Sequence, residues 1–306
     1  MTVAIDAVAA GFVALSAGRA AVPLRTRFQL DEGAVGLTMP ATLQGSPYYV
    51  VKLVSVVPAN PRRGRPLVAA TVVLSDAATG ELLALIDGES LTALRTGAAG
   101  GVAARLLAAP EARVVALFGA GAQARAQLLA VAAVRSVEEI RVVTRSPEHG
   151  AALLQWAAKR PELANARFSL QTADHAVPGA AIVITATSSP TPVFDGTLLG
   201  VGTHVTAVGA FTPNTRELDA AAMRGATVFV DQRDAALAEA GELVGSQASD
   251  VREIGAALAG HVPGRSDRDE RTVFKSVGNA IQDLVVAAAI YDRARELGLG
   301  EEVVLR

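Results

Sequence analysis

The sequence contains no cysteine, and aromatic residues make up only 4% of its 306 residues. The absence of cysteine excludes disulfides, thiolate nucleophiles and thiolate metal ligands. The four histidines show no metal-ligand spacing and no H-E-x-x-H motif occurs, so we expect no metal site. A net charge of −2 without a basic tract gives nucleic-acid binding no electrostatic support.

Long uncharged apolar runs are also missing, and the N-terminus carries no basic, apolar, cleavable signal. We therefore expect a cytoplasmic protein without a membrane partner. Hydrophobic residues nevertheless make up 51% of the chain, and few of them are aromatic. This composition suits close packing of helices on sheets, in one large or two medium domains.

The first third of the chain predicts a helix followed by antiparallel strands. We expect a helix over Asp6–Ala20, an extended segment over Val22–Leu30, and strands over Tyr48–Val57, Leu67–Ser75 and Leu82–Asp87. The basic loop between the first two of these strands, Asn60–Arg65, is interpreted as a solvated hairpin tip. A helical pattern rich in Ala and Gly, Ser90–Ala108, ends before Pro110.

Strands and helices alternate after this helix, which favours an α/β fold with a parallel sheet covered on both faces. The expected strands are Val114–Phe118, Ile140–Thr144, Arg167–Leu170, Ala181–Ala186, His204–Gly209, Thr227–Val230 and Thr272–Val277. The last helix, Ala280–Leu297, is apolar on a broad face, and we expect it to pack back on the N-terminal domain. The predicted domains are residues 1–110 plus 280–306, and residues 111–279.

The most informative motif is the run VVALFGAGAQARAQLL, Val114–Leu129. A strand, a tight glycine turn and a helix start follow one another, which is the context of a dinucleotide fingerprint. Gly119 makes the turn, Gly121 lets the backbone approach a pyrophosphate, and the helix N-terminus favours phosphate charge. The alternative is an ordinary glycine turn before a helix.

The residues after the second strand of this unit bear on the choice of nucleotide. An Asp or Glu there holds the ribose 2′-hydroxyl in NAD-binding folds. This chain has Thr144, Arg145 and Ser146 instead, and an arginine suits a 2′-phosphate. We therefore favour NADPH, with NADH possible. The alternative is that Arg145 is a solvated cation paired with Glu148 or Glu138.

Three cations lie in surroundings that are otherwise poor in charge: Arg25, Lys52 and Arg95. Cations within a β-branched strand or on an Ala/Gly helix are rarely buried without a partner. Either each finds a protein carboxylate, with Asp87 and Glu89 as candidates, or the three converge on the anionic group of a ligand. Their number and the scarcity of nearby acids favour a carboxylate pocket.

The chain resembles the ornithine cyclodeaminase/μ-crystallin family nearly from end to end. The segments that carry the resemblance are Val22–Arg25, Met39–Ala41, Lys52–Val54, Ala70–Thr71, Leu85–Ala99, Gly119–Gln123, Val208–Pro213, Arg216–Asp219, Thr272–Gly278 and Ala280–Asp283. The combination of D-G-x-x-L-T-A-x-R-T-G-A-A with G-A-G-x-Q-A is highly specific.

The resemblance implies a Rossmann domain, residues 111–279, inserted in an α+β domain that binds substrate and forms a homodimer. It implies that Arg25, Lys52 and Arg95 hold the substrate carboxylate and that Thr71 lines the same pocket. The strand-end turns around Thr187 and Gly209 are placed to wall the cofactor. The full set of predicted cofactor-binding residues is Thr96, Gly119, Gly121, Ala122, Gln123, Thr144, Arg145, Ser146, Thr187, Ser188, Val208, Gly209 and Lys275.

One departure distinguishes branches of the family. Phe211 stands where the cyclodeaminases and alanine dehydrogenases of the family carry an Asp that works with the substrate amine. The sequence of the segment Gly209–Pro213 instead resembles that of bacterial Δ1-pyrroline-2-carboxylate reductases. That resemblance implies NAD(P)H-dependent reduction of a cyclic imino acid to L-proline or L-pipecolate, in proline metabolism, with Phe211 against the substrate ring.

Lys52 and Arg95 are the predicted catalytic residues, because they fix the carbon that receives hydride. The imine nitrogen must be protonated, and the proton is carried by the substrate or comes from water or Lys52. Three other functions stay open: an ornithine or lysine cyclodeaminase, an amino-acid dehydrogenase, and a non-catalytic NADP- or ligand-binding protein of the μ-crystallin type.

Overall fold

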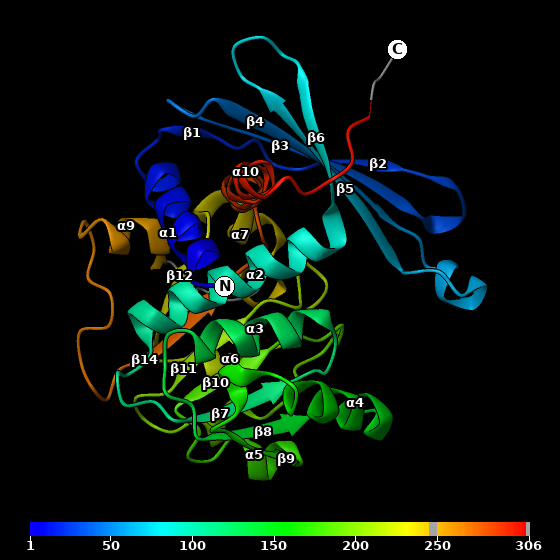
Figure 1. Cartoon of the computed structure of the whole chain (residues 1–306). Coiled ribbons are helices and arrows are strands. Elements are labelled where there is room, and N and C mark those ends of the chain that lie inside the picture. Colours follow the sequence, from blue (N-terminus) through cyan, green and yellow to red (C-terminus); the bar gives the residue numbers. More distant parts are fainter. Residues whose placement is uncertain (245–249, 304–306) are drawn as a thin grey trace.

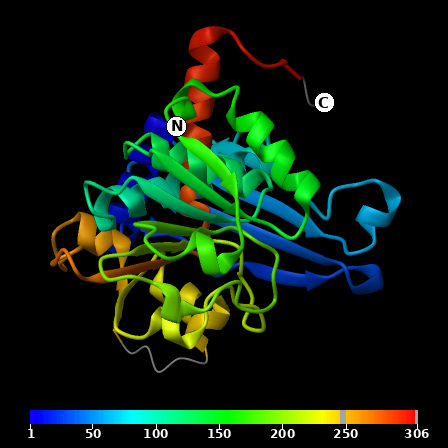
Figure 2. The same ribbon diagram turned by 90° about the horizontal axis from the view of Figure 1, so that it is seen from below.

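A computed structural model describes residues 1–244 and 250–303. Two sheets lie at opposite ends of the molecule, and the helices α1 (Thr2–Ser16), α2 (Gly88–Leu107) and α10 (Ala280–Leu297) lie between them (Figure 1). In Figure 2 the β2 and η2 (Asn60–Arg63) end of the first sheet projects beyond the second. The site described below forms where these layers meet.

The first sheet is antiparallel, with strand order β1-β3-β4-β5-β6 and β2 paired to the other end of β3. Its strands are β1 (Ala20–Ala21), β2 (Thr26–Gln29), β3 (Val35–Leu43), β4 (Tyr48–Val56), β5 (Val68–Asp76) and β6 (Leu82–Asp87). One face packs on α10 and α1 through Val50, Val72 and Leu74, which are fully buried. A short 3-10 turn, η1 (Asp31–Gly33), links β2 to β3.

The second sheet is parallel, with strand order β13-β12-β14-β11-β10-β7-β8-β9, which confirms the predicted α/β fold class. Its strands are β7 (Val114–Phe118), β8 (Glu139–Val143), β9 (Arg167–Leu170), β10 (Ile182–Thr185), β11 (His204–Ala207), β12 (Ala226–Val230), β13 (Val251–Glu253) and β14 (Arg271–Lys275). The order reverses at β7, and ligands bind beside such switch points at the carboxyl ends of the strands.

Short helices and turns connect these strands. They are α3 (Ala122–Ala132), α4 (Pro147–Ala157), η3 (Pro161–Leu163), α5 (Ala173–Ala176), η4 (Gly196–Leu198), α6 (Ala220–Met223), α7 (Arg233–Glu239), α8 (Gly241–Val244) and α9 (Ile254–Leu258). The long helix α2 packs against α3 on one side and against α1 and α10 on the other. It therefore links the parallel sheet to the antiparallel one.

Two elements differ from the prediction. The first helix spans Thr2–Ser16 rather than Asp6–Ala20, because the chain turns at Gly18 with φ of 69°. The strand β3 was not predicted, since it contains Gly36 and Pro40. Proline lacks an N–H, but β2 pairs only with Val35–Thr38 and β1 only with Thr42–Leu43, so Pro40 falls where one side of β3 has no partner strand.

Candidate functional site

A buried charge cluster lies between β4, α2 and α10. Lys52 Nζ is 2.8 Å from one oxygen of Asp283 and 3.0 Å from the other, and Arg95 Nε is 3.2 Å from the same carboxylate. Lys52 is 2% exposed, Arg95 7% and Asp283 0%. Two cations therefore share one carboxylate, and these three side chains together carry a single positive charge. Asp231, also buried, lies beyond Gln282 from Arg95 and offsets part of this charge, while the two cations remain suited to an anionic ligand.

Strand alternation places the lysine there. Lys52 shares the inward face of β4 with Val50, and α10 packs on that face. Burial lowers the pKa of Lys52 from 10.5 to about 8; the carboxylate of Asp283 opposes this shift and the charge of Arg95 adds to it. The ammonium is therefore charged at neutral pH but releases its proton more readily than a surface lysine.

Gln282 and Asp231 orient the guanidinium of Arg95. Arg95 Nη1 donates to Gln282 Oε1 at 2.8 Å, and Gln282 Nε2 donates to Asp231 at 3.2 Å. Asp231 also accepts from the N–H of Gly278 at 2.8 Å. Arg95 Nε faces the carboxylate of Asp283 at 3.2 Å, without hydrogen-bond geometry to any residue that the structure describes.

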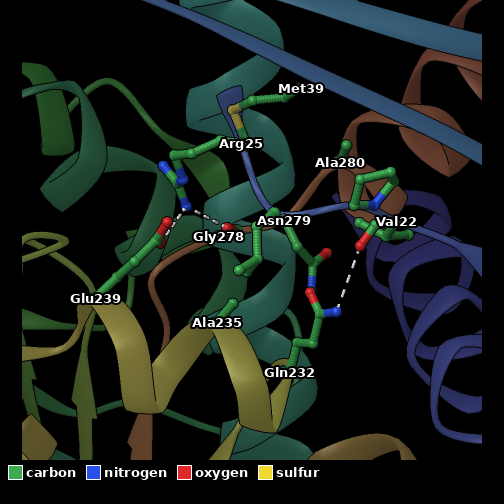
Figure 3. Close-up of a pocket in the computed structure, with 11 residues that line it drawn as sticks. Val22, Arg25, Met39, Gln232, Ala235, Glu239, Gly278, Asn279 and Ala280 are labelled. Atoms are coloured by element: carbon green, nitrogen blue, oxygen red, sulfur yellow. Dashed lines mark hydrogen bonds and ion pairs between the residues drawn. The ribbon is translucent and has the colours of Figure 1, made fainter. Parts of the chain in front are cut away.

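Arg25 forms the outer part of the site, in the segment between β1 and β2. Its Nη2 lies 2.9 Å from Glu239 of α7 and donates to the carbonyls of Val277 and Gly278, at 3.0 and 2.8 Å. Figure 3 shows this side chain reaching across a small pocket to Glu239 and Gly278.

The cations thus pair with Asp283 and Glu239, and not with Asp87 or Glu89, the carboxylates considered from the sequence. Asp87 instead caps α2 by accepting from Ser90 N.

The glycine turn after β7 fits a dinucleotide. Gly119 has φ of 107°, and a Cβ atom there would lie 2.4 Å from the carbonyl oxygen of Ala186, so only glycine fits. A Cβ atom at Gly121 would meet open space, and no side chain caps α3, whose first residue is Ala122. The buried Oε1 of Gln123 has no hydrogen-bond partner among the described residues. Free donors and open space at this N-terminus suit a pyrophosphate.

The tip of β8 carries Thr144, Arg145 and Ser146. Arg145 is exposed, as a ligand for a 2′-phosphate requires. Ser146 is already engaged: its hydroxyl accepts from the N–H of His149 at 3.1 Å and donates to Glu148 at 2.7 Å. A carboxylate therefore lies beside the predicted 2′-phosphate position, an arrangement that the sequence did not reveal.

Glu217 joins the two strand-end turns that the sequence placed beside the cofactor. It is fully buried and accepts from Thr185 Oγ1 at 2.9 Å, from the N–H and hydroxyl of Thr187 at 2.7 and 2.8 Å, and from the N–H of Gly209 at 2.7 Å. One carboxylate thus fixes the spacing of the turns after β10 and β11. In these two turns, Ser188 is exposed and Val208 is half-buried.

Lys275 supports the turn that follows β11. It is fully buried, donates to the carbonyl of Ala210 at 2.7 Å and pairs with Glu242 at 3.2 Å. Phe211 follows Ala210 and is 41% exposed. The phenyl ring is therefore free to contact a ligand, whereas the lysine ammonium is occupied by protein partners.

Two other predicted residues lie apart from the charge cluster. Thr71 is exposed and pairs across strands with Leu53, so it lies on the sheet face opposite to Lys52. Thr96 is buried on α2, where its carbonyl accepts from Gln127 Nε2 at 2.8 Å. In the described ranges no cluster of metal-ligating side chains occurs, and no helix is long and apolar enough to cross a membrane.

Comparison with known proteins shows to which family the chain belongs. The sequence profile of the ornithine cyclodeaminase/mu-crystallin family matches residues 1–298. The chain belongs to this family. The resemblance predicted from the sequence is confirmed.

Several relatives align over nearly the whole chain. A Delta(1)-pyrroline-2-carboxylate reductase of Bacillus cereus is 38% identical over 297 residues, covering 94% of this chain and 90% of the relative. The structure of Thermococcus litoralis Delta(1)-pyrroline-2-carboxylate reductase in complex with NADH and L-proline superposes with a TM-score of 0.93 at 35% identity, covering 98% and 95% of the two chains. An archaeal alanine dehydrogenase dimer with bound NAD also has a TM-score of 0.93, at 31% identity and 100% and 95% coverage.

Sequence reasoning missed the polar residues that support the site in this family member. Glu217 and Asp283 lie in segments that carried the family resemblance, but no role followed from the sequence because their partners are distant in the chain. Asp283 and Lys52, for example, are 231 positions apart. Asn279, between two such segments, also escaped notice.

Proposed function

We propose that this protein reduces a cyclic α-imino acid, Δ1-pyrroline-2-carboxylate or its six-membered homologue, to L-proline or L-pipecolate. The observation that carries the proposal is the convergence of two buried cations, Lys52 and Arg95, on Asp283, close to the loop that follows β14. The relatives that carry the same activity in their names, at 35% and 38% identity, support the choice of substrate.

The protein's own contribution is to hold the carboxylate. Lys52 and Arg95 offer buried cationic groups to its oxygens, and Arg25 reaches them once its guanidinium leaves Glu239. Fixing the carboxylate fixes the adjacent C2 carbon, which must lie at van der Waals distance from the hydride donor. Phe211 supplies an apolar surface for the ring, and it cannot serve the proton transfers that an amine substrate requires.

A nicotinamide dinucleotide is the cofactor that fits the turns at Gly119, Gly121 and Gly209. When bound, it supplies the hydride. We propose NADPH as the preferred form because Arg145 is exposed at the tip of β8, with NADH also accepted. Arg145→Ala should then weaken NADPH more than NADH in fluorescence titrations, and equal losses would refute the 2′-phosphate role.

We also propose a homodimer formed through the open face of the antiparallel sheet. Leu53 and Leu85 lie on this face and are 46% and 62% exposed, which is unusual for leucines in a sheet. The archaeal relative that is named as a dimer supports the assembly. A second copy would bury these side chains.

The function is tested by a substrate panel with purified protein. Five- and six-membered cyclic imino acids, pyruvate with ammonia, and ornithine are each supplied with both nicotinamides, and NAD(P)H oxidation and ammonia release are followed. Rapid reduction of a cyclic imino acid supports the proposal. Ammonia release from ornithine would establish a cyclodeaminase, reduction of pyruvate with ammonia an amino-acid dehydrogenase, and no turnover with tight binding a ligand-binding protein.

A further inference from the structure

The side chain of Asn279 is a buried amide without a protein partner. Asn279 is 4% exposed, and neither its Oδ1 nor its Nδ2 makes a hydrogen bond to any residue within 1–244 or 250–303. It occupies the N-cap position of α10, yet its side chain caps no N–H of that helix. An unsatisfied buried amide is destabilising, so a ligand that satisfies it is a natural explanation.

The amide lies beside the cations of the site. Asn279 follows Gly278, whose carbonyl accepts from Arg25 at 2.8 Å. A Cβ atom at Gly278 would lie 2.5 Å from Arg95 Nη1, so the backbone there touches that guanidinium. Asn279 and Arg25 line the same pocket, shown in Figure 3. In Figure 3 the amide of Asn279 is turned towards Gln232, and a carboxylate held by Arg25 would occupy the pocket that these residues line.

An α-imino acid presents matching groups. Its protonated ring nitrogen is a donor, its carboxylate is an acceptor, and both are bonded to C2. A primary amide offers one acceptor and two donors in a plane. The carboxylate of Asp283 is already shared by Lys52 and Arg95, and Phe211 provides no acceptor. Gln282 Oε1 and the carbonyl of Gly278 already accept from Arg95 and Arg25, which leaves Asn279 Oδ1 as a neutral acceptor in this pocket without a donor among the described residues.

We propose that Asn279 recognises the ring nitrogen of the substrate: its Oδ1 accepts from the iminium N–H. This inference rests on the proposed function. The reaction consumes the iminium and NAD(P)H and yields the secondary amine and NAD(P)⁺. The N–H proton stays on nitrogen throughout, so the amide transfers no proton and acts by selecting the protonated imine.

The test compares two ligands that differ only at this nitrogen: L-proline and cyclopentanecarboxylate, titrated into wild-type protein and Asn279→Ala with saturating NADP⁺. Asn279→Ala should weaken L-proline about tenfold, the loss expected for one buried hydrogen bond. Cyclopentanecarboxylate, which has no ring nitrogen, should change by less than about twofold. Equal losses for the two ligands, or no loss for either, would overturn the assignment.

Two controls keep the outcome interpretable. Asn165→Ala removes an exposed amide of the parallel-sheet half and should leave both affinities unchanged. Asn279→Ser keeps a residue that caps helices well and gives the same comparison if the alanine variant does not fold. Wild-type protein that binds neither acid and reduces no cyclic imine would refute the proposed function, whereas wild-type activity with equal ligand losses would refute only the role of Asn279.

Discussion

At the residue scale, Lys52 combines burial with the charge that the proposed carboxylate binding needs. Burial lowers its pKa to about 8, so its ammonium is protonated below that pH and neutral above it. The affinity for cyclopentanecarboxylate, which does not titrate above pH 6, should therefore be constant up to pH 8 and fall about tenfold for each further pH unit. Isothermal titration across pH 6.5–10 measures this dependence.

Lys52→Met is the matched variant for this pH profile. It removes the titrating ammonium, so binding should be weak and should show no break near pH 8. A break at the same pH in both proteins would assign the titration to another group and contradict the role of Lys52.

Glu239 provides an internal carboxylate that competes for Arg25. Their ion pair is 2.9 Å long, with the two side chains 15% and 17% exposed, and burial raises the pKa of Glu239. In the proposed binding mode the substrate carboxylate displaces Glu239 from Arg25, so Glu239→Gln should lower KM for the imino acid by roughly threefold or more. Glu296→Gln, which removes an exposed pair with Arg293, is the control and should leave KM unchanged. An increase in KM for Glu239→Gln would show that Glu239 positions Arg25 for the substrate.

At the element scale, strand β11 contains a buried histidine that makes stability depend on pH. His204 is hydrogen-bonded to Thr272 and Thr206 at 2.9 and 3.0 Å, and burial, with Arg265 and Arg135 nearby, lowers its pKa from 6.5 to about 3. The folded protein keeps this imidazole neutral, whereas the unfolded chain protonates it below about pH 6.5. Its contribution to stability is therefore complete above pH 6.5 and is lost as the pH falls towards 3.

The prediction concerns the slope of stability against pH. Below pH 6.5, protonation of His204 in the unfolded chain should lower the free energy of unfolding by about 1.4 kcal/mol per pH unit. His204→Gln, measured by urea denaturation at pH 7, 6 and 5, should show a shallower decline than the wild type. Parallel curves for the two proteins would mean that His204 does not titrate on unfolding.

The elements also show how far the sequence alone could go. The strands around the glycine turn were predictable because short β-branched runs alternate with helical segments rich in Ala and Leu. Strand β3 was not, since Pro40 reads as a strand breaker unless one knows that two short strands pair on either side of it. The convergence of Lys52 and Arg95 was predicted from their apolar surroundings, and their role in the site stays a prediction. Asp283 was not predicted, because only folding brings α10 onto β4.

At the scale of the whole molecule, the open sheet face predicts the oligomeric state. Leu53 and Leu85 are directed away from the core and are exposed in the single chain. Leu85→Asp combined with Leu53→Asp should convert a dimer to a monomer in light scattering, because two charges would be buried in an apolar interface. Leu297→Asp, at an exposed position at the end of α10, is the control. A dimer that survives the double substitution would place the interface elsewhere.

The central claim is that Lys52, Arg95 and Arg25 hold a substrate carboxylate next to the nucleotide. It is tested most directly by measuring KM for Δ1-pyrroline-2-carboxylate and Kd for NADPH in wild-type protein and in Arg95→Ala. We predict that KM rises about 100-fold or more, as expected when a buried charged donor is lost, while Kd for NADPH changes less than about threefold. An unchanged KM would contradict the account.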